Sequence, residues 1–238
     1  MELNSILPTP FLSFLIITYR RPDKVFNLLT DFLSPKWLGL DLKMFEIVIA
    51  DDHSEDNTLE VIHPILEELK SLGWSVRYVY RKTNLRGDRN LYDGFSKDSR
   101  GEYVWFLCDD DRIEVQEAIK FIEAIDNIKP SVAICGFEQG DYNQFGTKFD
   151  GDVRLIEDYT ESIEYLVKFP KTTAYLMRRR NSADLDELFE KLDLSLFSWI
   201  GLSIYLLGID RKEKLLIYPN VVAHADQDYG LLRYSYRV

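Results

Sequence analysis

Short apolar runs of strand length alternate with helical patterns along the first half of the chain. Of all the sequence features, this alternation restricts the possible folds most strongly. The runs are residues 13–17, 46–50, 76–80, 103–107 and 131–135. Continuous apolar runs of this length are typical of strands that are covered on both faces. Because helical segments separate them, the sequence predicts an α/β sandwich with a mostly parallel sheet.

The intervening segments carry apolar residues at helical spacing. Helices are expected to begin at Pro22 and at Thr58, and to cover residues 91–98 and 114–127. The apolar stretch from Leu194 to Ile209 is shorter than the roughly 20 residues of a membrane-spanning helix. We therefore interpret that stretch as a buried helix.

Composition excludes some classes of partner. The chain has 238 residues and a formal net charge of -11, which disfavours a nucleic-acid surface because phosphate binding needs clustered Lys and Arg. Its two cysteines fit a reducing compartment. No segment has the order of a signal peptide, so we expect a cytoplasmic protein. The cationic, aromatic residues 231–238 are compatible with peripheral contact at the inner face of a membrane, although a packed or disordered terminus is the commoner case.

Polar residues follow three of the predicted strands directly. They are Thr18-Tyr19-Arg20, Asp51-Asp52 and Asp109-Asp110-Asp111. In open parallel sheets, ligands bind beyond the carboxyl ends of the strands. We therefore expect all three groups to lie along one edge of the sheet.

The acidic run Asp109-Asp110-Asp111 is the strongest of these features. Three adjacent carboxylates repel one another, so their position at a strand end is unfavourable without a cation. Mg²⁺ and Mn²⁺ take oxygen ligands, commonly one or two carboxylates together with substrate phosphates. The alternative is a helix N-terminus, where the dipole favours acids. The position after a buried strand, opposite a second acidic strand end, favours the metal site.

Two further groups carry candidate nucleotide contacts. The Asp52 carboxylate can accept a hydrogen bond from a base N–H, whereas a turn that precedes a helix is the alternative reading of this segment. In the polar loop of residues 86–90, Gly87 permits a close approach of the backbone to a ligand. Arg86 or Arg89 can contact a base or phosphate, and a surface salt bridge is an equally common role for such residues.

Other phosphate-binding classes lack their signatures here. The chain has no Gly-rich phosphate loop of the Walker type and no G-x-G-x-x-G after the first strand. A nucleotidyltransferase also uses carboxylates and a metal, but normally shows a Gly-rich loop where this chain has Thr18-Tyr19-Arg20-Arg21-Pro22. A nucleotidyltransferase is therefore a weaker alternative.

Four motifs occur in order over about 110 residues: LIITYRRP at 15–22, FEIVIADDHSEDNT at 45–58, NLRGDRN at 84–90 and GEYVWFLCDDD at 101–111. Together they resemble the family 2 glycosyltransferases. The resemblance implies the A-type glycosyltransferase fold, a Rossmann-like α/β/α sandwich. It also implies inverting transfer of a sugar from a UDP-sugar, or a dTDP- or GDP-sugar, with Mg²⁺ or Mn²⁺ as cofactor. Residues 10–138 would bind the nucleotide sugar, and residues 139–238 the acceptor, within one domain.

The resemblance also implies roles for individual residues. The nucleotide-binding set would be Thr18, Tyr19, Arg20, Asp52, Arg86, Arg89 and Asp109. Asp110 and Asp111 would hold the metal, with His224 as a further candidate ligand, although a satisfied, partly buried His is commoner. Cys108 stands where members often carry an Asp, and we interpret it as a small buried residue rather than a soft-metal ligand.

The catalytic base is the part of the pattern that this chain lacks. Members usually take it from an acidic pair at the start of a helix in the second half, but Ser195–Ser203 contains no acid. Asp193 just before this segment is the first candidate, and Asp226 and Asp228 are the others. The missing pair leaves open a catalytically inactive relative that binds nucleotide sugar. By resemblance, the acceptor is a saccharide or lipid-linked saccharide of surface polysaccharide or glycolipid assembly.

Overall fold

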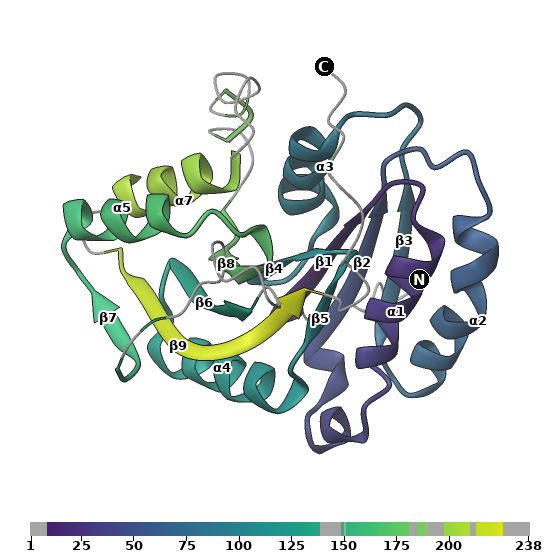
Figure 1. Ribbon diagram of the computed structural model, residues 1–238, viewed down its shortest axis with the longest axis horizontal. Helices are drawn as coiled ribbons and strands as arrows, with labels where there is room; N and C mark the ends of the chain where they lie inside the picture. The colour runs from purple at the N-terminus through teal and green to yellow at the C-terminus, as the bar shows by residue number, and fades with distance from the viewer. Residues whose placement is uncertain are drawn as a thin grey trace, which may run out of the picture.

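The computed structural model describes residues 9–138, 149, 151–180, 185–187, 189, 198–209 and 213–225. In this part of the chain, one curled sheet has the strand order β3-β2-β1-β4-β8-β6-β9-β5, and β7 pairs with β9 (Figure 1). The strands are β1 (Leu12–Thr18), β2 (Phe45–Asp51), β3 (Ser75–Tyr80), β4 (Tyr103–Cys108), β5 (Asp111–Ile113), β6 (Val132–Glu138), β7 (Arg154–Ile156), β8 (Tyr175–Arg178) and β9 (Leu215–Ala225).

The pairing divides the sheet into two parts. β3, β2, β1 and β4 are parallel, with Leu12 of β1 opposite Phe45 of β2 and Tyr103 of β4. β8 then lies antiparallel between β4 and β6, while β6 and β9 are parallel to each other. The first four strands thus form the parallel core that the sequence predicts, and the second part of the sheet is mixed.

Helices cover both faces of the sheet. They are α1 (Pro22–Asp31), α2 (Thr58–Ser71), α3 (Gly87–Asp93), α4 (Val115–Ile128), α5 (Tyr159–Lys168) and α7 (Ser198–Ile209). Figure 1 shows α4 below the curled sheet and α5 and α7 above it, which gives an α/β/α sandwich. Among the described residues, no helix is long and apolar enough to cross a membrane.

The alternation of side chains along β1 explains why both faces need a cover. Phe14 packs its ring against aromatic residues on one face, including Phe32 directly after α1 and Trp37, at centroid distances of 5.0 and 5.8 Å. Its neighbour Leu15 points to the other face, where Gly94 leaves no room for a Cβ atom because the Leu15 side chain would lie 2.7 Å away. Both side chains are fully buried, and each such burial contributes about 1.5–3 kcal/mol.

The first four predicted strands and the helix near residue 114 are confirmed within one residue at each end, whereas β6 begins one residue later and ends three residues later than predicted. The segment predicted to be a helix over 91–98 differs, since α3 begins earlier, at Gly87. A π-helical turn, Gly94–Asp98, follows α3 directly. Gly94 meets Leu15 at this junction, so tertiary packing rather than local pattern sets the geometry there.

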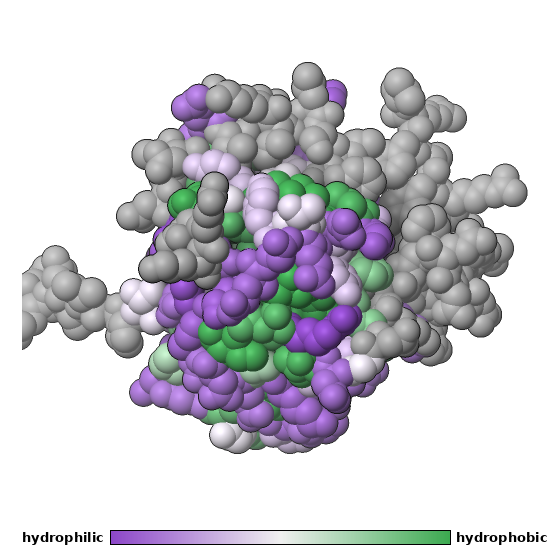
Figure 2. Space-filling model, turned by 90° about the vertical axis from the view of Figure 1, so that its left-hand side faces the viewer, coloured by the Kyte–Doolittle hydropathy of each residue, from purple (hydrophilic) through white to green (hydrophobic). Residues whose placement is uncertain are grey.

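The end of the molecule that carries β7 and α5 has an apolar surface. Figure 2 shows that face with a group of hydrophobic residues surrounded by hydrophilic ones. Among the described residues of the second half, the exposed large apolar side chains are Val153, Leu155, Tyr159, Val167 and Ile209. This surface belongs to the half of the chain predicted to bind the acceptor.

Candidate active site

The acidic run occupies the tight connection between β4 and β5. Asp109 and Asp110 form the turn, and Asp111 begins β5. All three are buried, with residue exposures of 5%, 5% and 1%. Burial of three adjacent carboxylates is costly unless cations or hydrogen-bond donors compensate them.

Asp109 is compensated by β1 and the loop after it. The Thr18 hydroxyl donates a hydrogen bond of 2.7 Å to Asp109 Oδ2, and Arg21 Nη1 lies 3.3 Å from Oδ1. Burial, followed by the neighbouring charge of Asp110, nevertheless raises the pKa of Asp109 to about 7. This carboxyl therefore holds its proton more tightly than an exposed aspartate does.

The same guanidinium nitrogen also reaches Asp110. Arg21 Nη1 lies 3.1 Å from Asp110 Oδ2, so one nitrogen bridges two carboxylates. Sequence analysis did not select Arg21, although it directly follows the predicted Thr18-Tyr19-Arg20 group. Only the close approach of β1 and β4 reveals its role.

Asp111 faces a different set of partners. Lys171 Nζ lies 3.0 Å from Asp111 Oδ1, and the Thr173 hydroxyl donates to Oδ2. Burial raises the pKa of Asp111 to about 6 in spite of the opposing effect of Lys171. Lys171 and Thr173 lie at the start of the 3-10 turn η4 (Thr172–Ala174), and no motif in the sequence marked them.

These residues fit a divalent cation. One ligand atom from each of Cys108, Asp110 and Asp111 lies within 4.8 Å of the others. Among the described residues, this is the only group of three or more His, Cys, Asp or Glu side chains placed to hold a metal ion. Burial raises the pKa of the Cys108 thiol to about 12, so it stays protonated and the carboxylates are the available ligands. Oxygen donors of this kind suit Mg²⁺ and Mn²⁺.

The ends of β1 and β2 meet beside the acidic run, as the sequence predicts. The Asp52 N–H donates to the Thr18 carbonyl at 2.9 Å. Asp52 is buried, and its Oδ1 accepts the Leu85 N–H at 2.6 Å, while burial raises the pKa of its carboxyl. Asp52 therefore joins the end of β2 to the loop that precedes α3.

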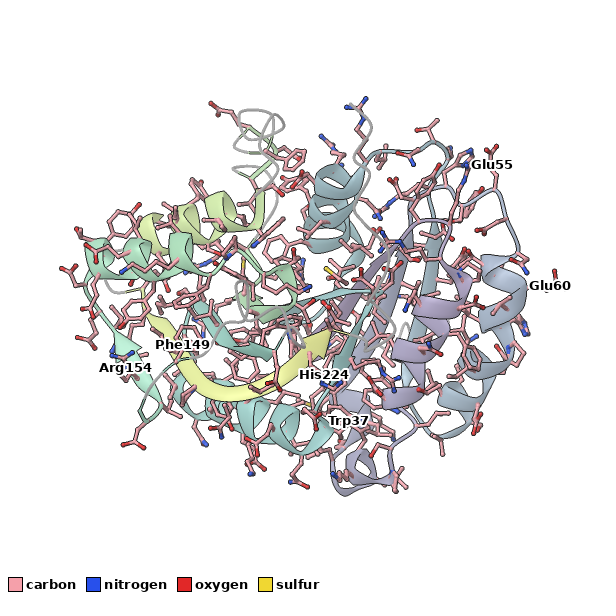
Figure 3. The ribbon with its side chains drawn as sticks, viewed as in Figure 1. Trp37, Glu55, Glu60, Phe149, Arg154 and His224 are labelled. Carbon is pink, nitrogen blue, oxygen red and sulfur yellow. The ribbon has the colours of Figure 1, made fainter. Side chains whose placement is uncertain are left out.

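Three residues with left-handed backbone lie in these same loops. They are Arg20, His53 and Arg86, with φ of 53°, 67° and 67°. The Arg20 N–H donates to Ser54 Oγ at 2.7 Å and its side chain pairs with Glu55 at 3.1 Å, at the outer edge seen in Figure 3. Strained backbone of this kind persists where a site needs a particular loop shape.

The remaining residues predicted to bind the nucleotide lie directly after β1 and at the start of α3. Tyr19 is exposed at 39%, which leaves its ring available to a ligand. Arg89 is engaged within its own helix, with Nε 3.0 Å from Asp93 Oδ1 and the guanidinium over the Phe189 ring. Arg86 precedes α3 at its N-terminus.

His224 lies on β9 opposite Arg112 of β5, and Figure 3 shows it near the end of β9. Its Nδ1 is 3.3 Å from Glu114 Oε1. Because neighbouring residues of a strand point to opposite faces, His224 and Arg112 point away from the face of Asp111. Asp193, Asp226 and Asp228 lie outside the described residues.

A carboxylate from the first half meets the start of α7. Asp88 Oδ1 accepts hydrogen bonds from the Ser198 hydroxyl at 2.5 Å and from the Ser198 N–H at 3.3 Å. Asp88 was not selected from the sequence because it lies 110 residues away from the helix that it caps. The structure thus supplies an acid where the helix sequence has none.

A largely parallel sheet with buried carboxylates beyond the end of β4 defines an α/β protein with the A-type glycosyltransferase architecture. The model of the family described as Glycosyl transferase family 2 matches residues 13–185. The chain belongs to this family.

Solved structures agree on the fold. Staphylococcus aureus TarS 1–349 in complex with UDP has a TM-score of 0.66 and 20% identity over 90% of this chain and 60% of that one. The mannosyltransferase PcManGT from Pyrobaculum calidifontis, in complex with GDP-Man and Mn²⁺, has a TM-score of 0.60 and 15% identity over 93% and 58%. The chain thus spans about 60% of these relatives, and no curated protein sequence matches it significantly.

Proposed function

We propose that this protein transfers a sugar, with inversion and metal dependence, from a nucleoside-diphosphate sugar to an acceptor hydroxyl. The observation that carries the proposal is the buried carboxylate run at the end of β4, joined to the ends of β1 and β2 by Thr18 and Asp52. Such a run is costly to bury without a cation, and a divalent cation next to a nucleotide pocket suits this chemistry.

The proposed donor site divides into a metal part and a nucleoside part. Asp110 and Asp111 would hold Mg²⁺ or Mn²⁺. His224 points away from the face of Asp111, so it is a further candidate only if the end of β9 turns and its pairing with Glu114 breaks. The nucleoside would contact Thr18, Tyr19, Arg20, Asp52, Arg86, Arg89 and Asp109. When bound, the cation supplies charge neutralisation for the departing nucleoside diphosphate.

The donor class is suggested by the relatives. Structures of TarS contain UDP or UDP-GlcNAc, and that of PcManGT contains GDP-Man with Mn²⁺. We propose a UDP-sugar as the first donor to test, with GDP- and dTDP-sugars as alternatives. The acceptor would be a saccharide or lipid-linked saccharide, bound by the second half of the chain.

Of the candidates for the catalytic base, Asp193 and Asp88 come before Asp226 and Asp228. Asp193 is the candidate from the sequence, and Asp88 is the one that the structure brings to the start of α7. Asp88→Asn and Asp193→Asn would separate them, because loss of a base lowers kcat while donor binding persists. The variant that loses about 100-fold or more in kcat, with unchanged UDP affinity, identifies the base.

A thermal-shift screen of UDP-, GDP- and dTDP-sugars with and without Mn²⁺ tests the donor. A ligand that binds only the folded state raises the melting temperature by mass action. Release of nucleoside diphosphate that requires Mn²⁺ and disappears in Asp110→Ala supports the enzyme. Binding without release, with saccharide acceptors present, supports the inactive relative, and absence of any nucleotide shift contradicts the proposal.

A further inference from the structure

Two cations lie against the acidic run, and their surroundings differ. The Lys171 side chain is 21% exposed, its Nζ lies 4.4 Å from the centre of the Phe137 ring, and its partner Asp111 is almost fully buried. The Arg21 side chain is 43% exposed. Lys171 is therefore the more enclosed of the two cations, and Arg21 is the one that solvent reaches more readily.

Arg21 contacts Asp110, one of the proposed metal ligands, and its neighbour Asp109. A single nitrogen, Nη1, is 3.3 Å from Asp109 Oδ1 and 3.1 Å from Asp110 Oδ2. A divalent cation that takes Asp110 as a ligand cannot lie beside this nitrogen, because the two positive groups would repel at contact distance. Metal binding and the Arg21 bridge are consequently competing states.

The backbone of Arg21 is held in place, so its side chain stays near the carboxylates even after it is released from them. Its carbonyl accepts the N–H groups of Lys24 and Val25 at 3.1 Å each, so Arg21 is anchored at the N-terminus of α1. A helix N-terminus favours anions, and a guanidinium matches the geometry of phosphate oxygens. Only the side chain has to move for Arg21 to meet an anion near the carboxylates.

We propose that Arg21 is a resident counter-cation that a divalent ion displaces from Asp109 and Asp110, and that it then binds the donor diphosphate. The second step rests on the proposed function, and the first does not. Without metal, Arg21 stabilises the buried carboxylates. With metal bound, the Arg21 guanidinium instead neutralises negative charge on the incoming diphosphate.

The test is the affinity of the protein for Mn²⁺ alone, measured by electron paramagnetic resonance for the native chain and Arg21→Met. Removal of the competing guanidinium is expected to tighten Mn²⁺ binding about five- to tenfold, the scale of one partly buried ion pair. Arg21→Lys keeps the positive charge but lacks the planar guanidinium, so an intermediate affinity for Mn²⁺ is expected. Arg180→Met is the matched control, because its side chain is 40% exposed and its guanidinium pairs with Glu213 instead, and the Mn²⁺ affinity of this variant should change by less than about twofold.

UDP titration in saturating Mn²⁺ tests the second step. Arg21→Met is expected to bind UDP about tenfold more weakly than the native chain, and Arg21→Lys less weakly than Arg21→Met. Unchanged or weaker Mn²⁺ binding in Arg21→Met overturns the counter-cation role, and unchanged UDP affinity overturns the diphosphate role. If no nucleotide binds the native chain but Arg21→Met still tightens Mn²⁺ binding, the proposed function fails and the counter-cation role stands.

Discussion

Thr18 donates a hydrogen bond of 2.7 Å to Asp109, across 91 residues of sequence, and so joins the carboxyl ends of β1 and β4. The two strands are parallel neighbours, with Ile17 of β1 opposite Cys108 of β4. The register of the sheet therefore brings the proposed nucleoside contact and the acidic run together.

Loss of the Thr18 hydroxyl should weaken this junction. Thr18→Val keeps the shape of the side chain but leaves Asp109 without this donor, at an expected cost of about 1–3 kcal/mol in the free energy of unfolding. Thr18→Ser retains the hydroxyl and should cost less. Urea unfolding without metal measures both, and equal stability of Thr18→Val and the native chain would show that the bond contributes nothing.

Asp110→Asn should remove metal-dependent function while the fold is retained. The side chain keeps its size but loses the charge that a hard cation needs, so we expect a loss of about 100-fold or more in kcat/KM. Asp126→Asn on α4 is the control, since that side chain is 61% exposed. Steady-state kinetics with Mn²⁺ measure kcat/KM for both variants, and equal values would argue against a metal role for Asp110.

Lys171→Met should destabilise the protein strongly. It leaves Asp111 as a buried carboxylate without its cation, which typically costs about 3–5 kcal/mol. Because Lys171 opposes the effect of burial, which raises the pKa of Asp111 to about 6, this pKa should lie higher in the variant, and the deficit should shrink as the pH falls towards 6, where the carboxyl takes up a proton in both proteins. Lys168→Met, at 64% exposure, is the matched control. Denaturant unfolding at pH 5 and pH 8 measures the effect, and a deficit independent of pH would contradict this explanation.

Metal binding should depend on pH through Asp109. Its pKa is raised from 3.8 to about 7, so the folded chain holds this proton more tightly than the unfolded chain does. The metal-free protein should therefore lose stability as the pH rises from about 4 to 7. A cation held by Asp110 and Asp111 would repel the proton on the neighbouring Asp109, so the affinity for Mn²⁺ should rise over the same range and level off above pH 7. Calorimetry in buffers of different ionisation enthalpy should detect proton release at pH 6 and little at pH 8.5, and equal release at both would refute the assignment.

The sequence by itself determined the parallel core and its chemistry. The apolar runs had to be strands because they need cover on both faces, and the polar groups had to meet because parallel strands end at one edge. Thr18, Asp52 and Asp109 therefore lie together as predicted. Local pattern sufficed because each of these residues directly follows or ends a buried strand.

Only the tertiary structure decided which groups compensate the carboxylates. Lys171 and Thr173 come from a 3-10 turn 60 residues or more after Asp111, and Asp88 caps a helix 110 residues later. Such contacts have no period or spacing in the sequence, because they depend on how β8 and α7 dock against the parallel core. The physical reason is that charge compensation acts between side chains at contact distance, which the packing of distant segments alone creates.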